Sequence, residues 1–209
     1  MEMTFGSKTA QLLEQPASIA TLAAAAFLLF SLAYVKKTGF STRMIVHIAS
    51  LLALTVILHM FRLFHMPQGG SITMGGMIPL LLIAFAYGPV GGYLAGFAYG
   101  MIHLFQDPYI LHPLQLLFDY PFPYMAIGLA GYFRHRMLTG AVLGICARFI
   151  CHFISGAVFF ASYAPAGVSP YWYSFVFNAT YLVPELIICL ILLRVLPVQR
   201  ILAQMGKQQ

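Results

Sequence analysis

Three polar side chains with binding chemistry lie inside apolar stretches of the sequence. They are Asp119, His152 and Asn178, each in a different stretch. A carboxylate, an imidazole and an amide together suit a positively charged ligand that also forms hydrogen bonds. No arginine or lysine lies near Asp119 in the sequence, and a carboxylate in apolar surroundings needs a partner. A cationic ligand would supply that partner.

The neighbouring polar residues follow helical spacing. Gln115 lies four residues before Asp119, and the last apolar stretch has polar residues at i, i+3, i+7, i+10 and i+14, on one helical face. Arg148 and Glu185 lie deeper, at similar depths, and we predict that they form an ion pair because an isolated charge there is costly. The stripe in the last stretch consists of Tyr171, Ser174, Asn178, Tyr181 and Glu185.

Several of these residues also have a purely structural interpretation. An intramembrane histidine such as His152 can serve as hydrogen-bonded packing between helices. Tyr109, Trp172 and Tyr173 near the ends of apolar stretches fit an aromatic belt. His112 and His152 lack a third ligand for a metal, so we predict neither a metal nor a cofactor.

The composition excludes a water-soluble protein. Of the 209 residues, 61% are hydrophobic and 8% are charged, and the mean hydropathy is +0.86. The formal charge of +6 comes from small basic clusters between apolar stretches, which indicates membrane topology and not nucleic-acid binding. The sequence has no phosphate-binding loop ending in Lys-Ser or Lys-Thr and no His-Glu-x-x-His motif, so we predict that the chain is not an enzyme.

The apolar stretches predict an all-α, multi-pass membrane protein. Residues 43–209 form one domain of six helices, and residues 1–42 add an N-terminal transmembrane helix with a cytoplasmic connector. A cleaved signal peptide is the competing interpretation of this first stretch, with Ser31-Leu32-Ala33 as its cleavage site. The predicted spans are 17–35, 43–62, 72–87, 90–106, 113–133, 139–161 and 172–196.

The basic residues predict the orientation in the membrane. With the first span running inward, eight lysines and arginines face the cytoplasm, while Lys8 and Arg62 face outward. This bias indicates an external N-terminus and a cytoplasmic C-terminus. The eight residues are Lys36, Lys37, Arg43, Arg134, Arg136, Arg194, Arg200 and Lys207.

Small residues recur every four positions in three of the predicted spans. At that spacing helix backbones can approach closely in lipid. We favour packing within the bundle over partner docking as the role of these positions. They are Gly92, Gly96 and Gly100, then Gly140 and Gly144, and Ala49 and Ala53.

A series of short motifs runs along residues 43–197. They are Gly70 to Thr73, Gly88-Pro89, Tyr109 to Gln115, Asp119-Tyr120-Pro121, Arg148-Phe149, His152 to Gly156, Ser162 to Pro165, and Tyr173 to Asn178. In order and spacing they resemble the thiamine-specific S-component family of energy-coupling factor transporters (ThiT or YuaJ type). The resemblance covers several motifs and is therefore specific.

The resemblance implies a six-helix subunit in the bacterial cytoplasmic membrane that binds thiamine at its outer face. Its implied partners are a transmembrane coupling subunit and two cytoplasmic ATPases. The small residues Ala49 and Ala53 correspond to the positions that dock the coupling subunit. The implied binding residues are Asp119, Tyr120, Tyr109, His152, Tyr173 and Asn178.

Two departures from the family pattern affect the expected site. Relatives have a stacking tryptophan after the histidine, where this chain has Phe159-Phe160, so we expect Phe160 to stack on the ligand. The loop from Met66 to Gly70 lacks a tryptophan that some relatives have. A self-sufficient proton-coupled thiamine carrier, and an S-component for another vitamin or a thiamine precursor, are the alternatives.

Overall fold

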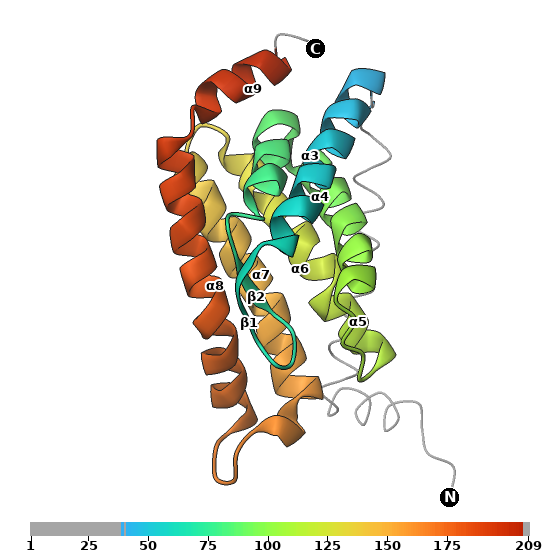
Figure 1. The fold of residues 1–209 in the computed structure, drawn as a ribbon, viewed down its shortest axis with the longest axis vertical. Helices are drawn as coiled ribbons and strands as arrows, with labels where there is room; N and C mark the ends of the chain where they lie inside the picture. The colour runs from blue at the N-terminus through green and yellow to red at the C-terminus, as the bar shows by residue number, and fades with distance from the viewer. Residues whose placement is uncertain (1–38, 40, 207–209) are drawn as a thin grey trace, which may run out of the picture.

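Helices account for most of the computed structural model, which describes residue 39 and residues 41–206 (Figure 1). The predicted span 17–35 lies outside the described residues. The elements are α3 (Thr42–Met60), β1 (Arg62–His65), β2 (Ser71–Thr73), α4 (Ile78–Gln106), α5 (Pro113–Asp119), α6 (Pro121–Ala126), the 3-10 helices η1 (Ile127–Phe133) and η2 (Ala161–Tyr163), α7 (Met137–Phe159), α8 (Pro170–Val195) and α9 (Val198–Gly206).

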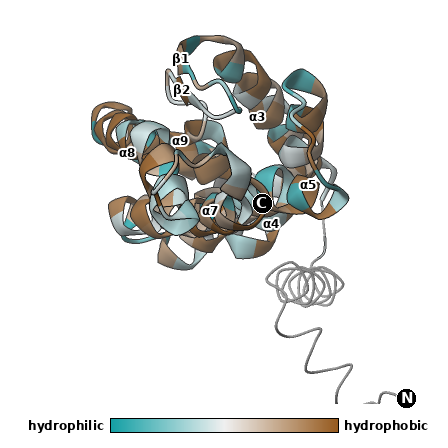
Figure 2. Ribbon diagram, turned by 90° about the horizontal axis from the view of Figure 1, so that it is seen from below, coloured by the Kyte–Doolittle hydropathy of each residue, from teal (hydrophilic) through white to brown (hydrophobic). Residues whose placement is uncertain are grey.

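The predicted all-α membrane fold is confirmed. In the described part of the chain, α3, α4, α7 and α8 are long and apolar enough to cross a membrane. The short hairpin of β1 and β2 is the exception that the sequence did not predict. It pairs Arg62 with Thr73 and His65 with Ser71 in antiparallel register. Viewed along the bundle, the hairpin lies between α3 and α8 (Figure 2).

A sharp turn divides α4 into two halves that fold back on each other. Gly88 has a φ of 77° and Pro89 follows it, so a helix cannot continue through this point. A Cβ atom on Gly92 would lie 2.9 Å from the Cβ of Ala84, eight residues earlier. This contact is impossible in a straight helix, so α4 corresponds to the two predicted spans 72–87 and 90–106.

The side chain of Arg134 caps the first half of α4. Its Nε donates to the carbonyl of Phe85 at 3.1 Å, and its Nη2 donates to that of Ala86 at 2.6 Å. The last carbonyl groups of a helix receive no hydrogen bond from an N–H group of the same helix. The guanidinium of Arg134 supplies the donors that these carbonyls lack at the turn.

Replacing Arg134 by alanine should therefore lower stability modestly. We expect a loss of about 1 kcal/mol, because the cap is partly exposed to solvent, and a fall in Tm of roughly 2–4 °C. Thermal unfolding of the detergent-purified protein measures this. Arg200→Ala, on the exposed surface of α9, is the matched control. Equal Tm values for the two variants would contradict the capping role.

Glycines allow α4 to pack directly on the backbone of α6 and η1. A Cβ on Gly96 would lie 2.2 Å from the carbonyl oxygen of Tyr124, and one on Gly100 would lie 2.5 Å from that of Tyr120. On α7, Gly144 faces the carbonyl of Ile127 in the same way, at 3.0 Å. The glycine spacing thus serves packing within the bundle, as predicted.

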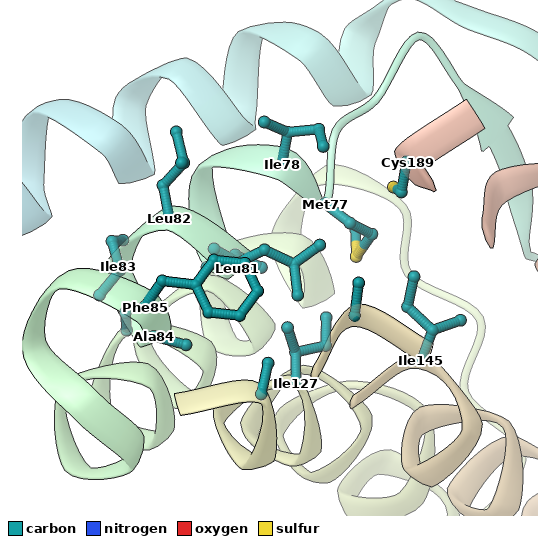
Figure 3. Packing of buried hydrophobic residues seen from close by; sticks show 14 of the residues in the cluster. Met77, Ile78, Leu81, Leu82, Ile83, Ala84, Phe85, Ile127, Ile145 and Cys189 are labelled. Carbon is teal, nitrogen blue, oxygen red and sulfur yellow. The ribbon is translucent and has the colours of Figure 1, made fainter. Parts of the chain in front are cut away.

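The hydrophobic core joins α4, η1, α7 and α8 (Figure 3). Its fully buried side chains include Leu81, Ile83 and Ile127. Cys189 also lies in this core, as expected for a small hydrophobic residue, whereas Cys146 is exposed on the outer surface of α7. The core leaves the hairpin end of the bundle free for a polar cavity.

Candidate ligand-binding site

A cavity of about 70 Å³ lies at the hairpin end of the bundle. Six of the seven predicted binding residues line it, namely Tyr109, Asp119, Tyr120, His152, Phe160 and Asn178. These residues come from α5, from α7 and its C-terminal end, from α8 and from the loop before α5. The structure therefore brings together residues that are up to 69 positions apart in the sequence.

A break in the helix fixes the position of Asp119. α5 ends at Asp119, and Pro121 starts α6, because a proline lacks the N–H group needed to continue the same helix. The side chain of Gln115 donates to Asp119 Oδ2 at 2.5 Å and to the carbonyl of Tyr109 at 2.9 Å. Gln115 thus ties the carboxylate to the loop that carries Tyr109.

His152 links the carboxylate to α8. Its Nδ1 lies 3.3 Å from Asp119 Oδ1, while its Nε2 accepts a hydrogen bond from Arg148 Nε at 3.3 Å. This pattern fits the tautomer with its proton on Nδ1. The side-chain amide of Asn178 donates to the backbone carbonyl of His152 at 3.3 Å, and Tyr181 donates to Asn178 Oδ1 at 2.7 Å.

Aromatic rings form another wall of the cavity. Phe160 stacks on Tyr109 with ring centroids 5.8 Å apart and an angle of 21° between the planes. The hydroxyl groups of Tyr109 and Tyr163 are hydrogen-bonded at 2.8 Å, which raises the pKa of Tyr109 to about 12. Tyr109 therefore stays neutral at physiological pH. Phe159 turns away and stacks on His112, so Phe160 is the member of the pair that faces the cavity.

Two aromatic residues near the start of α8 lie away from the cavity. Tyr173 packs against Phe177 at 5.9 Å between centroids and is not part of the lining, so its binding role stays a prediction. Trp172 is 62% exposed and stacks on Phe175. It faces the outside of the bundle, where an aromatic belt would lie.

The predicted ion pair between Arg148 and Glu185 is wrong. Across residues 41–206, the guanidinium nitrogens of Arg148 and the carboxylate oxygens of Glu185 do not come within 4 Å of each other. Glu185 accepts hydrogen bonds from the backbone N–H of Thr73 at 2.6 Å and from its hydroxyl at 2.7 Å. The hairpin, which the sequence did not predict, supplies these donors.

The buried Arg148 has other partners. Its Nη1 lies 2.8 Å from the sulfur of Met77, and its guanidinium carbon lies 4.5 Å above the ring of Tyr124. The face of an aromatic ring attracts a cation, which offsets part of the cost of burying this charge. Arg148 and Glu185 both line the cavity from its inner side without touching.

Sequence reasoning missed several lining residues. His59 and His103 lie side by side, 5.7 Å apart between ring centroids, and line the cavity from α3 and α4. Asp107 forms an ion pair with Arg62 at 2.9 Å, which joins β1 to the loop after α4. Both histidines are polar residues in apolar spans, so the argument that identified His152 applied to them as well.

Within the described residues, no group of three or more His, Cys, Asp or Glu side chains is arranged to hold a metal ion. The lining of the cavity offers a carboxylate, hydrogen-bonding groups and aromatic faces.

Comparisons with known proteins agree with this architecture. Residues 45–204 match the family described as thiamine transporter protein (Thia_YuaJ). The chain is 38% identical to the thiamine transporter ThiT of Bacillus subtilis over 168 residues, covering 71% of this chain and 87% of that protein. It is 30% identical to ThiT of Lacticaseibacillus paracasei over 123 residues, covering 49% and 61%.

A solved structure supports the fold. The structure of ThiT from Listeria monocytogenes superposes with a TM-score of 0.67 at 24% sequence identity, and the match covers 75% of this chain and 93% of that one. The helix arrangement described above is therefore shared with that protein.

Proposed function

The chain belongs to the thiamine transporter protein (Thia_YuaJ) family, and from that membership we propose that it captures thiamine as the substrate-binding subunit of an energy-coupling factor transporter. The family consists of transporters, so the chain is not an enzyme. One observation carries the proposal. Asp119 lines a pocket with aromatic walls and, among residues 41–206, has no lysine or arginine within 4 Å.

The chemistry of thiamine suits this pocket. Its thiazolium ring has a permanent positive charge, and its aminopyrimidine ring is flat and forms hydrogen bonds. Asp119 balances the charge, and Phe160 and Tyr109 offer ring faces for cation–π contact. Asn178 and His152 provide hydrogen-bonding groups for the pyrimidine.

Binding requires the pocket to widen. Pockets for small molecules usually measure about 300–1,000 Å³, several times the present cavity of about 70 Å³. The hairpin loop closes the cavity, because its Gly70 packs directly against the ring of Tyr181 on α8. A Cβ atom on Gly70 would lie only 2.8 Å from that ring. We place the opening at this contact between the hairpin loop and α8.

Calorimetric titration of the detergent-purified full chain tests the assignment. We expect saturable binding of thiamine, and riboflavin as competitor should leave it unchanged. Binding of riboflavin in place of thiamine would contradict the assignment. Intrinsic fluorescence is a poor substitute, because Trp172 is the only tryptophan and lies outside the pocket.

The charges at the two ends of the bundle support the predicted orientation. The start of α3, the connection between η1 and α7, the end of α8 and α9 lie at one end of the bundle (Figure 1). These segments contain Arg43, Arg134, Arg136, Arg194 and Arg200. By the excess of basic residues on the cytoplasmic side, this end faces the cytoplasm and the pocket opens to the outside. The C-terminus is then cytoplasmic.

The α3 surface suits a docking role. Ala49 and Ala53 are both exposed on α3, one turn apart, so their small side chains let a partner helix approach closely. We expect Ala53→Trp to abolish co-purification with the coupling subunit and two ATPases while thiamine binding persists.

Thiamine uptake by this chain alone in proteoliposomes would favour the self-sufficient carrier instead.

Replacing Phe160 by leucine should weaken thiamine binding by about three- to tenfold, the range of one cation–π contact that is partly shielded from water. Phe159→Leu is the matched control, because Phe159 stacks on His112 outside the pocket. Calorimetry on both variants measures the difference. Equal effects would show that Phe160 does not contact the ligand.

A further inference from the structure

Two adjoining grooves lie at the α9 end of α7 and α8, far along the bundle from the candidate site. The first, of about 650 Å³, is almost entirely apolar and runs along the spans. The second, of about 440 Å³, is basic. Leu138, Thr139 and Arg194 line both, so the grooves are continuous. The remaining lining is Val142, Ile187, Leu190, Ile191 and Val195 in the first, and His135, Arg136, Met137 and Leu193 in the second.

Within the described residues, the basic groove has no acidic partner. Of residues 41–206, only Asp107, Asp119 and Glu185 are acidic, and all three line the ligand pocket at the other end. Arg136 and Arg194 are exposed, and neither has a carboxylate within 4 Å in this part of the chain. Their charges are therefore available to an anion from outside the chain.

The start of α7 adds to this positive potential. α7 is 23 residues long, has no acidic residue in its first turn and has no side-chain cap. The N–H groups of Met137, Leu138 and Thr139 have no acceptor within the helix, and these three residues line the basic groove. Such N–H groups and the helix dipole favour a phosphate.

The apolar groove lies on the membrane-facing surface. Ile187 and Ile191 are 52% and 55% exposed on α8, a helix long and apolar enough to span the membrane. Arg194 lies in the last turn of that helix, at the level where lipid headgroups begin. An acyl chain fits the apolar groove, and its headgroup then reaches the arginines.

We propose that an anionic phospholipid occupies these grooves, with its phosphate between Arg136 and Arg194 and an acyl chain along Leu138, Ile187 and Ile191. A protein partner would have to match an apolar groove inside the membrane and a basic one at its surface. A phospholipid has both parts in one molecule. Basic pockets between helix ends are known to bind such headgroups.

Mass spectrometry of the intact full chain, released from detergent micelles with added phosphatidylglycerol or phosphatidylcholine, tests the proposal. We expect selective retention of phosphatidylglycerol. The double variant Arg136→Ala/Arg194→Ala should retain it about 25-fold less tightly, or roughly fivefold per arginine. Arg200→Ala is the matched control, since Arg200 is exposed at the same end but outside both grooves.

A second variant tests the acyl-chain part of the site. Ile191→Trp fills the apolar groove without changing charge, and it should reduce retention of phosphatidylglycerol several-fold. Thiamine binding by both variants verifies folding, because these residues lie outside the ligand pocket.

Three results would overturn the proposal. The first is equal retention of the two lipids, and the second is equal loss in Arg200→Ala and the double variant. The third is unchanged lipid retention in the double variant together with lost co-purification of the ATPase subunits, which would assign the basic groove to a protein partner.

Discussion

Replacing Asp119 by alanine is expected to weaken thiamine binding by at least tenfold, which is about 1.4 kcal/mol. Three carboxylates line the pocket, but Asp107 already pairs with Arg62 at 2.9 Å, and both carboxylate oxygens of Glu185 accept hydrogen bonds from Thr73. Asp119 instead contacts the imidazole of His152 and the amide of Gln115. Its charge is the one that remains to balance a thiazolium ring.

Asp107→Asn provides the control for this prediction. It removes the same charge from the same pocket, but from a carboxylate that Arg62 already neutralises. We expect an affinity change below about threefold, within the range of exposed ion pairs. An effect as large as that of Asp119→Ala would show that general negative potential, and not a direct contact, holds the ligand.

Asn178→Ala should also weaken thiamine binding at least tenfold. Loss of the amide removes a contact to the pyrimidine and leaves the buried hydroxyl of Tyr181 without its hydrogen-bond acceptor. Calorimetry measures both variants. If neither Asp119→Ala nor Asn178→Ala changes the affinity, the site assignment fails.

Helical spacing explains why much of the site was predictable. The stripe of the last span predicts that Ser174, Asn178, Tyr181 and Glu185 share a face, and all four are buried on α8. A polar residue in a span must face the bundle interior, and this one constraint brings polar faces of different helices together. The first member of the stripe, Tyr171, lies beyond the packed region and is exposed.

Contacts made by irregular backbone were not predictable. The hairpin between α3 and α4 lies mainly in the connector between the predicted spans 43–62 and 72–87, and its strands have four and three residues. Such short strands leave no periodic pattern. Without the hairpin, the sequence does not indicate Thr73 as a partner for Glu185, and the similar depth of Arg148 suggests an ion pair instead.

The breaks at prolines were easier to place than their consequences. Pro121 and Gly88-Pro89 mark the end of α5 and the turn within α4. The sequence does not show that Gln115 then reaches back to both Asp119 and the Tyr109 carbonyl. That geometry depends on how α5 packs on α7, a contact between distant parts of the chain.

Replacing Glu185 by alanine is expected to lower stability by about 3 kcal/mol and Tm by roughly 6–12 °C. Both Glu185 and Thr73 are almost completely buried, so the variant leaves the N–H and hydroxyl of Thr73 without their acceptor. Thiamine affinity should fall as well, because the same contact holds the hairpin that carries Gly70 and Ser71 into the pocket.

Glu185→Gln separates this hydrogen-bonding role from the ion pair that the sequence suggested. Glutamine keeps an oxygen that can accept from Thr73 but removes the charge. If the hydrogen bonds dominate, Glu185→Gln should lose about half as much stability as Glu185→Ala in thermal unfolding. If attraction to Arg148 dominates, the two variants should be equally unstable, since both leave the buried guanidinium without a nearby anion. The separation of the two side chains and the short bonds to Thr73 favour the first outcome.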